Sequence, residues 1–99
     1  MPAITRHQLP NGLSIVLKEQ HSAPVVSWWM LYRIGSRNER TGQTGLSHWV
    51  EHMMFKGTPQ FPGGVLDKMI SREGGTWNAQ TSMDYTAYYE TMPADRIDL

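Results

Sequence analysis

The chain of 99 residues contains no cysteine. This absence excludes disulfide bridges, thiolate zinc sites and cysteine nucleophiles. The chain also lacks an excess of charge of either sign, because nine lysines and arginines balance nine aspartates and glutamates. Bulk charge therefore gives no indication of a nucleic-acid or membrane-surface partner, and we expect neither.

Long hydrophobic runs are missing as well. The longest one, residues 25–34, is interrupted by Ser27 and Arg33 and is too short to span a bilayer. The first residues lack the apolar stretch of about 7 to 15 residues that marks a secretory signal. We expect a cytoplasmic location, although a signal removed earlier would leave the same start.

The most informative segment is His48-Trp49-Val50-Glu51-His52. It reads H-x-x-E-H, the inverse of the zinc-peptidase signature H-E-x-x-H. Two histidines four residues apart project from the same side of a helix, so both rings can reach one metal ion. Glu51 shares that side and is placed to take a proton from a metal-bound water rather than to act as a third ligand. The alternative is two surface histidines beside a solvated glutamate.

A helical wheel divides the residues around this motif into two opposed stripes. The apolar stripe is predicted to face a sheet and contains Leu46, Trp49, Val50, Met53 and Met54. The stripe predicted to line a cleft contains His48, Glu51, His52 and Phe55.

The rest of the chain predicts an α+β fold with a largely antiparallel sheet flanked by helices. Thr44 is expected to cap the helix of the motif, which Gly57-Thr58-Pro59 would end. A second short helix is expected from Val65 until Gly74-Gly75 stops it, and a third would begin at Pro93. Strands are expected over residues 4–9, 13–18, 25–34, 76–80 and 85–92. The apolar run 25–34 is typical of a strand covered on both faces.

Two blocks of the sequence resemble the active-site region of the M16 zinc metallopeptidases. This group of H-x-x-E-H enzymes includes pitrilysin, insulin-degrading enzyme and mitochondrial processing peptidase. The first block is G-S-R-N-E at residues 35–39 followed by G-L-S-H-W-V-E-H-M-M-F-K-G-T at residues 45–58. The second, residues 74–86, is similar to the family pattern G-G-x-x-N-A-x-T-x-x-D-Y-T. Residues 9–13 also resemble the first hairpin of the family.

The resemblance implies a zinc-dependent endopeptidase that hydrolyses peptides or small unfolded proteins. It makes His48 and His52 zinc ligands and Glu51 the general base. Asn78 and Ala79 would lie on an edge strand that binds the substrate backbone by strand addition.

Phe55 matches an aromatic residue that lines the catalytic cleft in the family. Plain core packing is an equally good explanation for it.

The sequence departs from the family pattern in two respects. Ser47 stands where alanine is usual, a small change. The third zinc ligand of the family is a glutamate on a later helix, and neither Glu73 nor Glu90 matches its position. We therefore expect residues 1–99 to be the N-terminal part of a single M16-like catalytic domain, truncated before that helix. A homologous second domain or subunit would close the cleft.

Two other functions remain open from the sequence. Some members of the family are non-catalytic partner or structural subunits, but these usually have a degraded zinc motif. S-ribosylhomocysteine lyase also uses H-x-x-E-H on a related fold, but it needs a reactive cysteine, which this chain lacks.

Overall fold

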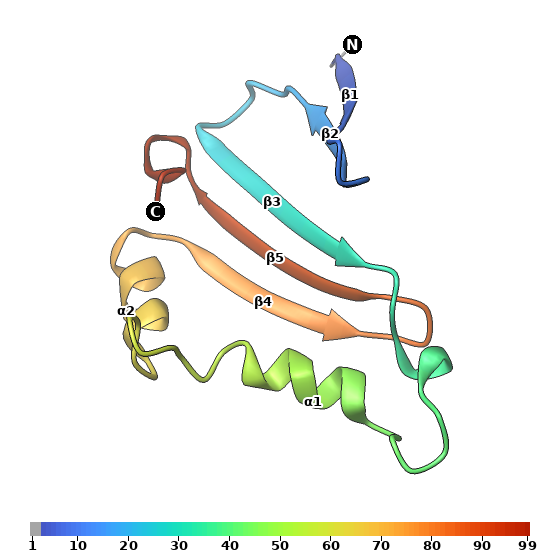
Figure 1. Ribbon diagram of the computed structural model, residues 1–99. Helices are drawn as coiled ribbons and strands as arrows, with labels where there is room; N and C mark the ends of the chain where they lie inside the picture. Colours follow the sequence, from blue (N-terminus) through green and yellow to red (C-terminus); the bar gives the residue numbers. More distant parts are fainter. Residues whose placement is uncertain (1–2) are drawn as a thin grey trace.

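The structure is a computed structural model that describes residues 3–99. Two α-helices and two antiparallel sheets make up most of an α+β fold, as predicted (Figure 1). Within the described residues, no helix has the length and apolar character needed to cross a membrane. The strands are β1 (Ile4–Gln8), β2 (Ser14–Lys18), β3 (Val25–Tyr32), β4 (Thr76–Thr81) and β5 (Thr86–Pro93), and the α-helices are α1 (Leu46–Met53) and α2 (Val65–Arg72).

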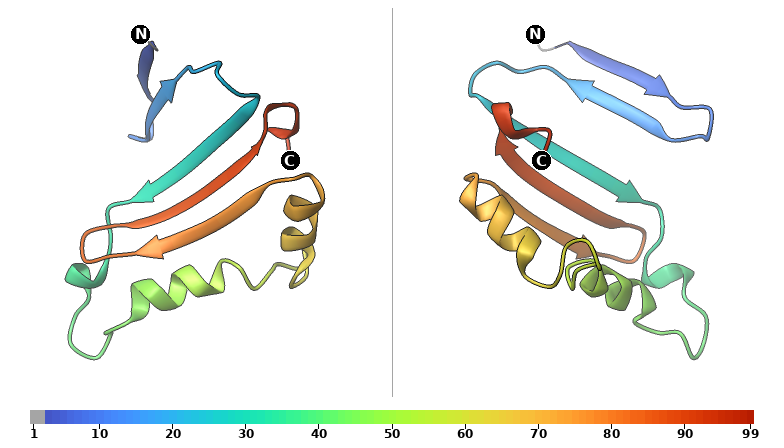
Figure 2. Two further views of the ribbon diagram at one scale, coloured as in Figure 1. Left: turned by 180° about the vertical axis from the view of Figure 1, so that it is seen from behind. Right: turned by 60° about the vertical axis from the view of Figure 1, so that its left-hand side comes forward.

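β1 and β2 form a separate two-stranded hairpin (Figure 2). Its turn is the predicted Pro10-Asn11-Gly12, where Gly12 has φ +92° and its N–H donates to the Leu9 carbonyl at 2.9 Å. The Asn11 side chain accepts a hydrogen bond from the Leu13 N–H at 3.1 Å. Glycine and asparagine are the residues that such a turn favours, and the predicted hairpin is confirmed.

The larger sheet has the order β3-β5-β4, with both pairs antiparallel. The central strand β5 contains Thr86, Ala87 and Met92, three of the few buried residues. β4 and β3 are the two edges, and both helices contact β4, with α1 running beside it (Figure 1). The elements that could carry chemistry are therefore gathered at one edge of the sheet.

The prediction that residues 25–34 are covered on both faces is wrong for the described chain. Trp28, Trp29 and Leu31 are 45%, 51% and 59% exposed. The apolar composition was read correctly as a strand, but β3 pairs on one side only and the helices contact β4 instead.

Three predicted helix boundaries need correction. The residue that precedes α1 as its N-cap is Gly45, with φ +90°, rather than Thr44. α1 ends at Met53, and single turns continue the chain toward Gly57. Pro93 is the last residue of β5, and the residues after it form a short 3-10 helix, Ala94–Arg96, instead of an α-helix.

Candidate metal centre

His48 and His52 project from the same side of α1 and converge. Their Nε2 atoms are 2.8 Å apart and their ring centroids are 4.4 Å apart. The convergence follows from the spacing, because four residues make about one helical turn. A metal ion held between the two rings would use the unprotonated nitrogens of both.

Glu51 joins the two histidines in one cluster. One ligand atom from each of the three side chains lies within 4.8 Å of the others. Both histidines are exposed and Glu51 is half-buried. Imidazole nitrogens are donors that zinc accepts, so His48 and His52 fit such an ion. The ligand and base roles of the three remain predictions.

Thr81, the last residue of β4, holds the Glu51 carboxylate against the sheet. Its hydroxyl donates a hydrogen bond to Glu51 Oε2 at 2.6 Å across 30 residues of sequence. The sequence analysis did not single out Thr81. A signal was present, since Trp77, Ala79 and Thr81 alternate along β4 and are its three half-buried residues.

The first turn of α1 is capped by a side chain that the sequence analysis also missed. The Glu39 carboxylate accepts hydrogen bonds from the N–H groups of Ser47 at 2.7 Å and Gly45 at 2.9 Å. These N–H groups have no partner within the helix, and a negative charge is favourable at this end of it. These two hydrogen bonds hold the pKa of Glu39 below its usual value of 4.5, and the one from the Ser47 N–H has the larger effect.

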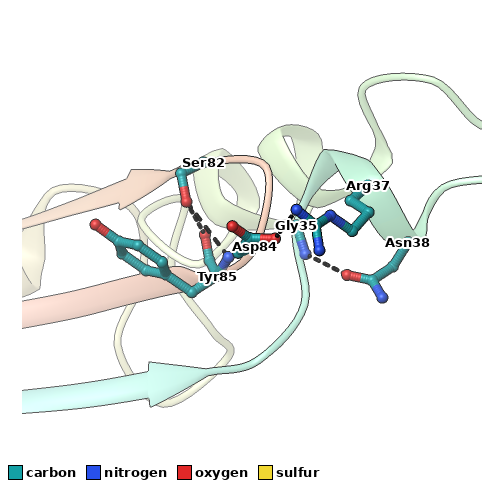
Figure 3. A network of polar contacts seen from close by, with 6 residues as sticks. All are labelled: Gly35, Arg37, Asn38, Ser82, Asp84 and Tyr85. Atoms are coloured by element: carbon teal, nitrogen blue, oxygen red, sulfur yellow. Dashed lines mark hydrogen bonds and ion pairs between the residues drawn. The ribbon is translucent and has the colours of Figure 1, made fainter.

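The segment that contains Glu39 is itself attached to the turn between β4 and β5 (Figure 3). Arg37 forms an ion pair with Asp84 at 2.9 Å, and the Arg37 N–H donates to the Met83 carbonyl at 3.0 Å. A side chain at Gly35 would collide with the Ser82 carbonyl, so only glycine allows this approach. The two sequence blocks that carry the resemblance therefore lie against each other.

The apolar stripe of α1 is divided in space. Trp49 and Met53 are 62% and 46% exposed, and the other three members are between 47% and 57% exposed, so no member of the stripe is buried against the sheet. The reason is that α1 runs beside the β4 edge, where the opposite stripe also reaches the sheet through Glu51. The other members of the apolar stripe, Leu46, Val50 and Met54, line a groove of about 280 Å³ with Tyr32 and Tyr88.

Phe55 lies in the turn that follows α1 and packs against the sheet. Its ring centroid is 4.6 Å from that of Trp77 and 6.5 Å from that of Tyr88. Partial burial raises the pKa of Tyr88, and the charge of Glu51 raises it further. An uncharged aromatic cluster therefore borders the base candidate at neutral pH.

Asn78 and Ala79 lie in the middle of β4, the edge strand. Ser82 N–H donates to the Tyr85 carbonyl at 2.9 Å, and paired residues along an antiparallel ladder alternate between bonded and non-bonded. Ala79, paired with Tyr88, falls in the non-bonded class. Its backbone groups consequently point away from β5 toward the open edge, where the Asn78 side chain accepts its N–H at 2.8 Å.

Comparison with known proteins shows the family to which the chain belongs. Residues 14–99 match the family described as Insulinase (Peptidase family M16). The chain belongs to peptidase family M16. The match covers α1, β4 and every residue of the candidate metal centre, so the His-Glu-His cluster occurs here in an M16 chain.

Individual M16 relatives carry several names. The zinc protease PqqE of Helicobacter pylori is 42% identical over 82% of the chain and 18% of its own length. Subunit 1 of the mitochondrial cytochrome b-c1 complex of Bos taurus is 37% identical over 90% of the chain and 18% of its own length. The crystal structure of a protease from H. pylori superposes with a TM-score of 0.90 at 37% identity, over 99% of the chain and 24% of its own. The chain thus spans about a fifth of the length of these relatives.

Proposed function

We propose that the protein carrying this chain is a zinc-dependent endopeptidase in which Glu51 is the general base. The observation that supports this most is the cluster of His48, Glu51 and His52 within 4.8 Å. Family membership and the relatives named zinc protease add to it. Within the described residues, the cluster is the one set of metal-ligand side chains of this kind.

The chemistry follows from what each residue can do. His48 and His52 would hold a zinc ion, which when bound acidifies water and stabilises negative charge on a carbonyl oxygen. Glu51 accepts the proton of the attacking water and returns it to the departing amine. Thr81 keeps this carboxylate beside the end of β4.

The open edge of β4 is the proposed substrate site. Ala79 presents its backbone N–H toward that edge, as an extended peptide added to the sheet would require. The Asn78 side chain would have to release this N–H when a substrate binds. Phe55, in the turn after α1, and Trp77 of β4 form an aromatic surface beside this strand, suited to a substrate side chain. Substrates would be peptides or unfolded proteins, because only extended chains can pair with an edge.

We further propose that these residues are part of a larger catalytic unit. Two histidines and a base leave one zinc ligand to be supplied from elsewhere, since catalytic zinc normally has three protein ligands. Glu73 is engaged in an ion pair with Arg96 at 2.8 Å, which argues against it as that ligand. The four- to fivefold greater length of the relatives leaves room for the ligand and for a second domain or subunit.

The decisive test replaces the base in the full-length protein. Glu51→Gln should retain zinc but lose at least about a hundredfold in kcat for a quenched peptide, because it removes the proton acceptor and no ligand. Glu19→Gln, an exposed residue just after the hairpin, is the matched control and should change nothing. Turnover of Glu51→Gln near that of the control would show that another group is the base.

A second test uses the 99-residue chain alone. It should bind zinc weakly and cleave no peptide, because one ligand is missing. Titration calorimetry of the metal-free chain with zinc measures this. Nanomolar one-to-one binding together with peptide hydrolysis would show that the third ligand is already present.

The rival function is that of a non-catalytic subunit. Its support is the relative named as subunit 1 of the cytochrome b-c1 complex. The endopeptidase needs a zinc ion bound at α1, whereas a subunit that only assembles with a partner needs no metal. A full-length protein that purified with a partner, held no zinc and cleaved no peptide would favour the subunit.

A further inference from the structure

The contact between Thr81 and Glu51 joins an exposed helix to an anchored strand. α1 has no buried side chain, so its packing alone restrains its residues weakly. Thr81, in contrast, is half-buried and is paired with Thr86, which is only 4% exposed. The Thr86 hydroxyl donates to the Ile34 carbonyl at 2.9 Å. This end of β4 is therefore held in place, whereas the neighbouring helix α1 is only weakly restrained.

The residue after Thr81 is anchored from the other side. Ser82 accepts a hydrogen bond at its carbonyl from the Ser36 N–H at 3.1 Å and donates its own N–H to Tyr85. The β-branched side chain of threonine also has few rotamers, so a fixed backbone fixes the hydroxyl. Thr81 can therefore define where the Glu51 carboxylate lies.

Thr81 also belongs to the edge that the proposed substrate would pair with. Thr81 and Ala79 are two residues apart and fall in the same non-bonded class of the β4–β5 ladder. The backbone of Thr81 thus faces the open edge, while its hydroxyl donates to Glu51. One residue connects the peptide-binding edge with the candidate base.

We propose that Thr81 is a positioning residue that fixes the Glu51 carboxylate relative to a peptide bound along β4. The hydroxyl holds Oε2, which leaves the lone pairs of Oε1 for the attacking water. This inference rests on the proposed function of Glu51. It adds a residue that touches neither metal nor substrate through its side chain and acts through the base.

Thr81→Val in the zinc-loaded full-length protein tests the proposal. Valine keeps the shape but removes the donor, so kcat should fall about ten- to a hundredfold, as for loss of a hydrogen bond to a charged group. KM and zinc content should stay within about twofold, because the backbone edge and the histidines are unchanged. Thr81→Ser keeps the hydroxyl and should recover most of the rate. Thr76→Val, at the other end of β4, is the matched control.

A double-mutant cycle separates positioning from a general effect on folding. Thr81→Val should have no further effect on kcat in a Glu51→Gln background, since the group that it positions is already lost. If Thr81→Val retained the parent kcat while Glu51→Gln abolished turnover, the positioning role would be wrong and the proposed function would stand. If Glu51→Gln itself were fully active, the proposed function would fail first. Equal losses in Thr81→Val and Thr81→Ser, with a lowered melting temperature, would indicate a structural role and overturn the proposal.

Discussion

α1 and α2 are both eight residues long, both follow a glycine with positive φ, and both contact β4, but they are held in different ways. α2 buries Ile70, which is 6% exposed and lies with Met92 against Gly75. α1 buries no side chain and is held by polar contacts, from Glu39 at its start and Thr81 at its middle. A helix that presents its side chains to a ligand cannot also bury them, so hydrogen bonds have to position it.

The comparison predicts that zinc affinity depends on α1 and not on α2. His48→Ala in the full-length protein should lower zinc affinity by at least about a hundredfold, because it removes one of the nitrogen ligands. The stability of the metal-free protein should change little, since His48 is exposed. Competition against a chelating dye measures the affinity.

His21→Ala is the control for that experiment, because His21 is an exposed histidine outside the cluster. An unchanged affinity in His48→Ala would place the zinc site elsewhere in the protein.

The free energy of unfolding, in contrast, should depend on α2 more than on α1. Ile70→Ala removes a buried side chain and should lower the free energy of unfolding by about 2 to 5 kcal/mol. Lys68→Ala on the exposed side of α2 should change it little. Urea denaturation followed by tryptophan fluorescence measures both. Equal destabilisation by the two variants would mean that α2 is not held by packing.

The smallest expected effect concerns Glu39 and depends on pH. Its pKa is lowered in the folded state by the Ser47 and Gly45 N–H groups, so the ionised carboxylate stabilises the fold. That stabilisation is complete above the unfolded pKa and is lost as the pH falls through the folded pKa. The parent should therefore be more stable than Glu39→Gln at pH 7, and the difference should shrink below about pH 4.

Urea midpoints at several pH values test the Glu39 prediction, with Glu19→Gln as the control. A difference that stayed constant down to pH 3 would indicate that the charge of Glu39 is not involved. Loss of the cap should also act only on α1 and leave the α2 packing unchanged.

Much of the fold follows from local patterns. The Asn11-Gly12 turn and the alternating strands beside it predicted the hairpin, because turn geometry depends on neighbouring residues only. The strand bounds differed by at most two residues from those observed. The helix start was misplaced because Gly45 precedes α1 and the capping group comes from Glu39, outside the local sequence.

The sequence by itself determined that His48 and His52 converge, because four residues of helix bring two rings together whatever surrounds them. Only the tertiary structure decided that Thr81 meets Glu51 and that Glu39 caps the helix. It also decided that β3 is exposed and that the apolar stripe of α1, Trp49 included, is not buried. Those features depend on strand order and on the edge along which α1 lies. Helical periodicity defines directions around one axis, and the position of that axis relative to the sheet is set by contacts between segments far apart in the chain.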